Sequence, residues 1–145
     1  MAQPSLTDIA QQAKAITGAE TAVVALAEDE GATLLYAAAA GRHTDVIIGK
    51  RSEVTASGLC GAALASGESE LVCQTQGDLR VRQDLAESLG ITTAIAAPIA
   101  HDNQILGALM VLNREDGSAF DKTHEAKLVA YVDEIADTLE RNAQR

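Results

Sequence analysis

Two cysteines, Cys60 and Cys73, are the side chains of this sequence best suited to covalent chemistry, and they are its only cysteines. They lie in the stretch GLCGAALASGESELVC, residues 58–73. A thiolate can attack an oxidised sulfur and a second thiol can resolve the product, so two cysteines allow a thiol redox cycle. We expect a short helix followed by a strand here. If these elements pack antiparallel, the two thiols lie near the same end.

The cysteines have two interpretations. Cys60 falls in the first turn of the expected helix, where the helix dipole favours a thiolate. The alternative is that both are core residues, since free cysteine is among the most often buried residue types. Cys60 would then pack beside neighbouring alanines, and Cys73 would share strand parity with Leu71. We favour the core interpretation, while the redox pair stays open.

Other residues offer less chemistry. The histidines are far apart in the sequence, in an expected loop, a turn and a helix start, and we expect surface positions for them: His43, His101 and His124. They lack metal-ligand spacing, and we recognise neither a hydrolytic triad nor a phosphate loop. The sequence therefore predicts no metal site and no cofactor.

Charge limits the partners. The chain has 21 acidic and 11 basic residues and a net charge of −10, which repels phosphate backbones and anionic lipid. We therefore expect neither nucleic acid nor a membrane as a partner. Arg80 and Arg82 lie in a segment expected to cover a pocket and could meet an anionic ligand. We favour salt bridges from them to Asp84 or Glu87.

The N-terminal stretch MAQPSLTDIAQQ has neither the basic region nor the apolar region of a secretion signal. The longest apolar run, residues 105–112, is too short to span a bilayer. We expect a cytoplasmic protein, in which cysteines stay reduced. The sequence shows no internal repeat or long linker, and it has only two prolines. These features favour one domain over residues 1–145.

Periodicity and turn signals predict helices over 5–17, 58–67, the second part of 76–90 and 121–142. They predict strands over 21–27, 32–41, 69–74, 91–100 and 104–114, whereas 42–57 reads as irregular. Neighbouring hairpins imply a mainly antiparallel sheet and hence the α+β class. Asp121 is the expected N-cap of the last helix, and Gly18 and Gly90 are expected to end helices.

Several strands are apolar at both parities, so both faces of the sheet must be covered. The terminal helices can cover one face and residues 42–90 the other, and a pocket for a small molecule is expected beneath the latter. The chain has only three aromatic residues, few for gripping a flat cofactor. Our candidate pocket residues come from these strands and the covering segment: Tyr36, Cys73, Arg82, Leu85, Thr93 and Ile95.

Three runs carry a family resemblance: SGLCGAALASGESELV, APIAHDNQILGALMVLNRE and AFDKTHEAKLVAYVDEIADTLE. The matching positions are Ala65 to Gly67, Pro98, Ile105 to Gly107, Leu109, Val111, Asn113, Phe120 and Glu125. The sequence resembles the GAF domain family of small-molecule sensors over nearly its whole length. The resemblance implies a GAF/PAS-like central antiparallel sheet, with terminal helices on one face and short helices and loops on the other.

Three GAF positions have a structural interpretation. Gly107 would allow close approach of a neighbouring backbone, and Phe120 would fill the base of the core. Asn113 would cap the loop that follows it through local hydrogen bonds.

Specific GAF activities fit less well. The cyclic-nucleotide motif has Arg114 and His124 where the family has lysine and aspartate. Bilin attachment usually needs a Cys-His pair, but glycine follows Cys60 and glutamine follows Cys73. The Gly-Leu-Cys-Gly step resembles free methionine-(R)-sulfoxide reductase, but the His-Ile-Ala-Cys-Asp run of that enzyme has no counterpart.

Apolar residues recur along the last helix with heptad-like spacing: Leu128, Val132, Ile135 and Leu139. Surplus residues such as Val129 could pair the terminal helices of two chains, and we expect a homodimer. Our main hypothesis is a non-enzymatic, standalone GAF domain that binds an unknown small molecule or a regulatory partner protein. The alternatives are a thiol-based redox enzyme or sensor using Cys60 and Cys73, and a ligand-free dimerisation scaffold.

Overall fold

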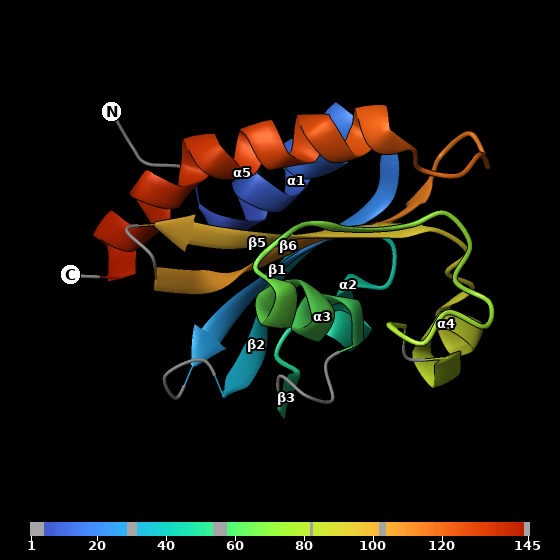
Figure 1. The fold of residues 1–145 in the computed structure, drawn as a ribbon, viewed down its shortest axis with the longest axis horizontal. Helices are drawn as coiled ribbons and strands as arrows, with labels where there is room; N and C mark the ends of the chain where they lie inside the picture. The colour runs from blue at the N-terminus through green and yellow to red at the C-terminus, as the bar shows by residue number, and fades with distance from the viewer. Residues whose placement is uncertain (1–4, 29–31, 54–57, 82, 102–103, 144–145) are drawn as a thin grey trace.

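Six strands form one antiparallel sheet in the computed structural model (Figure 1). The structure describes residues 5–28, 32–53, 58–81, 83–101 and 104–143, with only the backbone described for Leu85 and residues 137–143. The strand order is β3-β2-β1-β6-β5-β4. The strands are β1 (Ala19–Glu28), β2 (Thr33–Gly41), β3 (Arg51–Glu53), β4 (Glu70–Val72), β5 (Ala94–His101) and β6 (Gln104–Arg114). This arrangement confirms the predicted α+β class.

The described residues also form five helices: α1 (Leu6–Thr17), α2 (Thr44–Ile47), α3 (Gly58–Ser66), α4 (Gln83–Leu89) and α5 (Lys122–Ala143). Local chemistry sets the ends of α1 and the start of α5. Ser5 and Asp8 form a reciprocal capping box at the start of α1, and Gly18 ends that helix in the left-handed conformation. Asp121 Oδ1 accepts hydrogen bonds from the backbone N–H groups of Thr123 and His124 at the start of α5.

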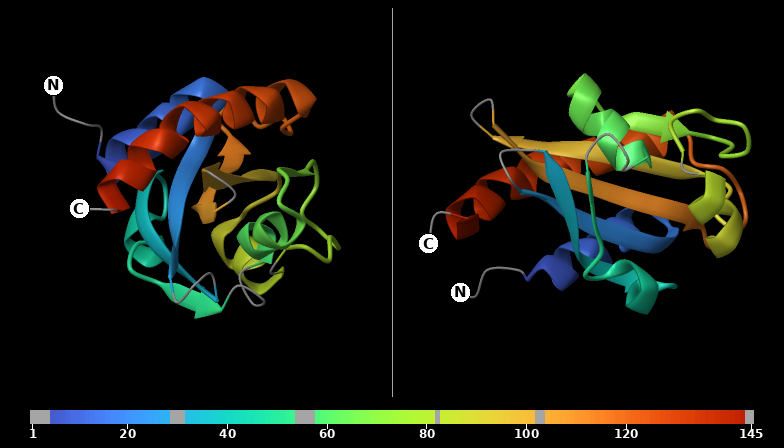
Figure 2. Two further views of the ribbon diagram at one scale, coloured as in Figure 1. Left: turned by 60° about the vertical axis from the view of Figure 1, so that its left-hand side comes forward. Right: turned by 90° about the horizontal axis from the view of Figure 1, so that it is seen from below.

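The long terminal helices α1 and α5 lie side by side on one face of the sheet (Figures 1 and 2). Their buried residues share one core with the sheet residues of that face, among them Ile9, Ala13, Phe120, Leu128, Val132, Ile135, Ile95 and Ile99. The described part of the heptad-like stripe therefore packs against its own sheet, and Val129 also packs on this core. The homodimer therefore remains a prediction, and the apolar stripe of α5 no longer supports it.

The other face is covered by the segment that runs from α2 to α4 (Figure 1). The expectation that 42–57 is irregular was wrong, because α2 and β3 form within it, while residues 54–57 lie outside the described part. Strand β3 pairs with β2 over three residues only. A charged edge strand this short, here Arg-Ser-Glu, shows no apolar alternation by which it could be recognised.

Gly107 has the structural role that the sequence indicated. It lies in β6 opposite Leu26 of β1. A Cβ atom built on Gly107 would be 2.0 Å from the backbone oxygen of Ala25. Glycine is therefore the residue that lets β1 and β6 approach at this point of the sheet.

Candidate functional site

A cavity of about 450 Å³ lies between the sheet and the covering segment, partly open to solvent. The sequence predicted a pocket at this place. Four strands supply its floor: Val23 of β1, Tyr36 of β2, Ala94 of β5, and Met110 and Leu112 of β6. The volume falls within the usual range for small-molecule sites.

The walls come from the covering segment. Their apolar members are Val46, Ile47, Leu59, Val81, Ala86, Leu89 and Ile91. Their polar members are Lys50, Arg51, Ser52, Thr75 and Ser88, and Gly58 completes the lining. Most of the surface offered to a ligand is therefore aliphatic, and Tyr36 is the one aromatic residue among the described residues that line it.

The two faces of β5 differ in side-chain size. Ile95 and Ile99 point into the core beneath α1 and α5, whereas Ala94 and Ala96 belong to the cluster on the cavity face. Further alanines of this cluster are Ala25, Ala39, Ala63 and Ala108. Protein interiors normally pack without large voids. Ala94 is the one of these alanines that lines the cavity, beside the larger side chains of Val23, Tyr36, Met110 and Leu112.

Cations lie at the mouth of the cavity. Lys50 and Arg51 are exposed as well as lining it. Arg51 Nε donates a hydrogen bond of 2.8 Å to Glu28 Oε1, whereas Lys50 has no ion pair with any residue that the structure describes. Tyr36 holds the backbone beside Lys50, since its N–H donates to Lys50 O at 2.9 Å and its carbonyl accepts from Gly49 N at 2.8 Å.

Hydrogen bonds of Thr75 connect the parts of the cavity wall that lie around α4. Its hydroxyl donates a hydrogen bond of 2.6 Å to the carbonyl of Ile91, and its carbonyl accepts one of 2.7 Å from Gln83 Nε2. Ile91 N in turn donates to Ala86 O at 2.8 Å. These bonds fix α4 and the turn after it against the loop that follows β4. Three of these four residues line the cavity: Thr75, Ala86 and Ile91.

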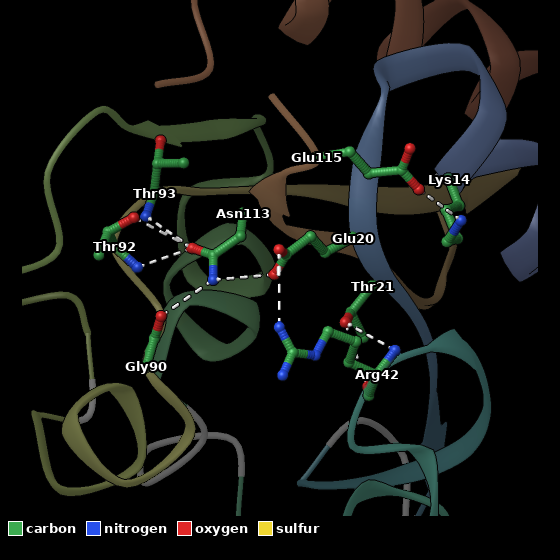
Figure 3. A network of polar contacts seen from close by, with 9 residues as sticks. All are labelled: Lys14, Glu20, Thr21, Arg42, Gly90, Thr92, Thr93, Asn113 and Glu115. Carbon is green, nitrogen blue, oxygen red and sulfur yellow. Dashed lines mark hydrogen bonds and ion pairs between the residues drawn. The ribbon is translucent and has the colours of Figure 1, made fainter. Parts of the chain in front are cut away.

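Asn113, at the end of β6, holds the same wall from outside (Figure 3). Its Oδ1 accepts hydrogen bonds from Thr92 N at 2.7 Å and from Thr92 Oγ1 at 3.2 Å, and its Nδ2 donates to Gly90 O at 2.9 Å. The expectation of local loop capping was wrong, because these partners lie 21 and 23 residues earlier in the chain. The side chain thus clamps the residues on both sides of Ile91.

The polar network continues along the same end of the sheet (Figure 3). Asn113 Nδ2 lies 3.5 Å from Glu20 Oε1, and Glu20 Oε2 lies 3.8 Å from a guanidinium nitrogen of Arg42. Thr21 Oγ1 exchanges hydrogen bonds with the backbone of Arg42. The start of β1, the end of β2 and the cavity wall are therefore joined on one side of the molecule.

The structure separates the candidate pocket residues. Tyr36 lines the cavity, but Ile95 points to the opposite face of the sheet. Thr93 is buried, and its hydroxyl donates to Val72 O at 2.8 Å and accepts from Phe120 N at 3.1 Å. Cys73 is exposed and does not line the cavity. Arg82 and the side chain of Leu85 lie outside the described residues.

The two cysteines occupy unlike environments. Cys60 is fully buried in α3, its Sγ lies 3.6 Å from Met110 Sδ, and burial raises the pKa of its thiol to about 12. The expectation that the helix start favours its thiolate was therefore wrong, because desolvation dominates over the dipole. Cys73, by contrast, is exposed just after β4, so its expected place in the core was also wrong.

Arg80 has structural partners other than the expected Asp84 and Glu87. Its Nε and one terminal nitrogen donate to the two carboxylate oxygens of Asp78 at 3.0 and 2.7 Å, and Glu70 lies 3.9 Å from the guanidinium. Hydrogen bonding from Arg80 lowers the pKa of Asp78. Arg80 is not among the residues that line the cavity.

All three histidines are partly exposed to solvent. The ring of His124 packs edge-on against Phe120 with 5.8 Å between centroids, and its Nδ1 accepts a hydrogen bond from Asp121 N at 3.0 Å. Among the described residues, no three His, Cys, Asp or Glu side chains are grouped so that they could hold a metal ion. In the same part of the chain, no helix is long and apolar enough to cross a membrane.

Comparisons with known proteins agree on the fold. The GAF domain of Acinetobacter phosphoenolpyruvate-protein phosphotransferase superposes with a TM-score of 0.81 at 15% identity, over 97% of this chain and 82% of that one. The second GAF domain of DevS from Mycobacterium smegmatis gives a TM-score of 0.77 at 16% identity, over 96% and 93% of the two chains.

An enzyme shares the fold as well. Free methionine-R-sulfoxide reductase from Neisseria meningitidis, solved with its substrate, gives a TM-score of 0.78 at 21% identity, over 96% of this chain and 78% of that one. No curated protein matches the sequence. The sequence profile of the GAF domain matches residues 6–140. The chain therefore belongs to the GAF domain family.

Proposed function

We propose that this GAF domain is a regulatory module that binds a small molecule in the cavity between its sheet and the segment from α2 to α4. The cavity itself is the observation that carries the proposal. It has the size and the mostly aliphatic lining of a ligand site, with a few polar side chains at its walls. A methyl-accepting chemotaxis protein is among the similar structures, as is the second GAF domain of DevS.

The covering segment suits a sensor. Its helices α2 and α4 have only four and seven residues, and its strands β3 and β4 have three each. Short elements with few buried contacts open at lower free-energy cost than the long strands and helices of the opposite face. A ligand that fills the cavity would add contacts to these elements and stabilise them.

The thiol redox alternative has less support, because its two thiols lie in unlike environments. Full burial shields Cys60 from substrate and raises the pKa of its thiol to about 12, so it is protonated at neutral pH, and Cys73 is left as the exposed thiol. The scaffold alternative loses its main argument, because the described part of the apolar stripe of α5 packs within its own chain. The small-molecule module is therefore the hypothesis that the geometry supports best.

A matched pair of variants tests the proposal. Leu89→Trp places a bulky ring in the cavity wall, whereas Leu79→Trp makes the same change at a fully exposed position that does not line the cavity. Low-molecular-weight extract from the native host should raise the melting temperature of the wild type and of Leu79→Trp, because a ligand stabilises the state that binds it. The melting temperature of Leu89→Trp should rise much less with the same extract. Equal responses of the two variants, or none in the wild type, would contradict the proposal.

A further inference from the structure

We infer that the cavity selects a small amphipathic monoanion, a carboxylate with an aliphatic body, whose charged group meets Lys50 at the mouth. This inference rests on the proposed function and adds the chemical class of the ligand. It follows from three features of the lining: the sign of its charge, the place of its cations and the shape of its apolar part.

The charge of the lining is opposite to that of the chain. The whole sequence has 21 acidic and 11 basic residues. The described residues that line the cavity include Lys50 and Arg51 and neither an aspartate nor a glutamate. Because the charged side chains among the described lining residues are both cations, the cavity offers a local attraction for anions on a chain with a net charge of −10.

Lys50 is the better placed of the two cations. Arg51 already donates to Glu28 at 2.8 Å, which neutralises much of its charge. Lys50 has no ion pair with a described residue, and its backbone is held beside that of Tyr36, a floor residue. One cation without a partner matches one negative charge, as in a carboxylate, better than the two charges of a phosphate monoester.

The apolar part of the lining fits an aliphatic body. Tyr36 is the single aromatic residue among the described lining residues, whereas valine, isoleucine, leucine and methionine supply most of the remainder. Flat ring systems are usually held between aromatic faces, and this cavity offers one such face. A volume of about 450 Å³ lies in the lower part of the usual range for small-molecule sites, which suits a small aliphatic ligand.

Eight-carbon probes that differ only in their head group test the inference. Octanoate, octanamide, octylamine and octyl phosphate are titrated at neutral pH, and the backbone amide signals of Tyr36 and Lys50 are followed by NMR. We expect octanoate to bind about tenfold more tightly than octanamide, as a charge-assisted contact with Lys50 implies. Octylamine should bind more weakly than either.

The variant Lys50→Gln should lower octanoate affinity to that of octanamide. Lys127→Gln is the matched control, because it makes the same charge change on α5, which packs on the other face of the sheet. Equal binding of octanoate and octanamide, tighter binding of octyl phosphate, or an equal effect of both variants would overturn the inference. If none of the probes binds, the inference also fails. The proposed function still stands in these cases if host extract stabilises the wild type but not Leu89→Trp.

Discussion

Asn113 Oδ1 accepts a hydrogen bond of 2.7 Å from the backbone N–H of Thr92, which lies 21 residues earlier in the chain. The contact joins the end of β6 to the segment that carries Ile91 into the cavity wall. Asn113 also has a φ of 57°, a left-handed conformation that asparagine adopts more readily than most residues. Both the side chain and the backbone therefore favour asparagine at this position.

Substitutions of Asn113 should separate these two demands. Asn113→Ala removes the side-chain hydrogen bonds and strains the left-handed backbone, so we expect a loss of about 2–4 kcal/mol in the free energy of unfolding. Asn113→Asp keeps an acceptor for Thr92 but loses the donor to Gly90 O and places a charge near Glu20. The free energy of unfolding of Asn113→Asp, measured in urea, should lie between those of Asn113→Ala and the wild type. An alanine variant within 0.5 kcal/mol of wild type would be incompatible with the clamp.

Gly107→Ala should disturb the centre of the sheet. The added Cβ would meet the backbone oxygen of Ala25 at 2.0 Å, so β1 and β6 must move apart. We expect a loss of about 1–3 kcal/mol, the usual cost of overpacking. Gly77→Ala is the control, because a Cβ there meets open space and only its φ of 77° opposes the change. Calorimetry showing Gly107→Ala as stable as the wild type would refute the close approach.

The two thiols should differ in reactivity. A disulfide reagent at neutral pH should modify Cys73 within minutes and Cys60 only after denaturant is added, because Cys60 is buried with a raised pKa. Rapid modification of both thiols in the folded protein would revive the redox pair. Cys73→Ala should abolish the modification within minutes and leave the modification that needs denaturant.

The buried Cys60 thiol also predicts an alkaline effect. Its pKa is about 12 in the folded chain against 9.0 as the ordinary value, so above about pH 9 the unfolded chain loses this proton first. The free energy of unfolding should then fall as pH rises, by at most about 1.4 kcal/mol per pH unit from this group. Cys60→Ala should show a shallower decline between pH 9 and 11. Identical slopes for the two proteins would exclude the effect.

Acid should weaken the pair formed by Asp78 and Arg80. Because Arg80 lowers the pKa of Asp78 in the folded chain, the pair stabilises the fold above the ordinary value of 3.8 and loses this effect as pH falls further. Asp78→Asn should cost about 1 kcal/mol or less at pH 7. The difference in the free energy of unfolding between Asp78→Asn and the wild type should shrink below about pH 4. A difference that stays constant from pH 7 to pH 2 would argue against the pair.

The sequence predicted the class and the main elements because long strands and helices have clear periods and glycine ends. It also placed a pocket beneath the covering segment. It could not choose the face of β5, because Ile95 and Ala94 are both apolar and a shift of one residue exchanges the two faces. The contrast between isoleucine on one parity and alanine on the other was a signal that could have been used.

The remaining errors have different physical origins. Cys73 shares parity with Leu71, but β4 ends at Val72 and leaves it exposed. The partners of Asn113 lie more than 20 residues away, beyond the reach of any local pattern. Lys50 lies in a segment that read as irregular, because α2 and β3 are too short to show a period.

The most direct test of the account is native mass spectrometry of the protein purified from its native host. We predict one non-covalent adduct on the wild type and on Leu79→Trp, with a mass that fits an aliphatic molecule of the size of the cavity. Leu89→Trp, which narrows the cavity, should lose that adduct. Bare wild-type protein, or the same adduct on all three proteins, would contradict a ligand-binding role for the cavity.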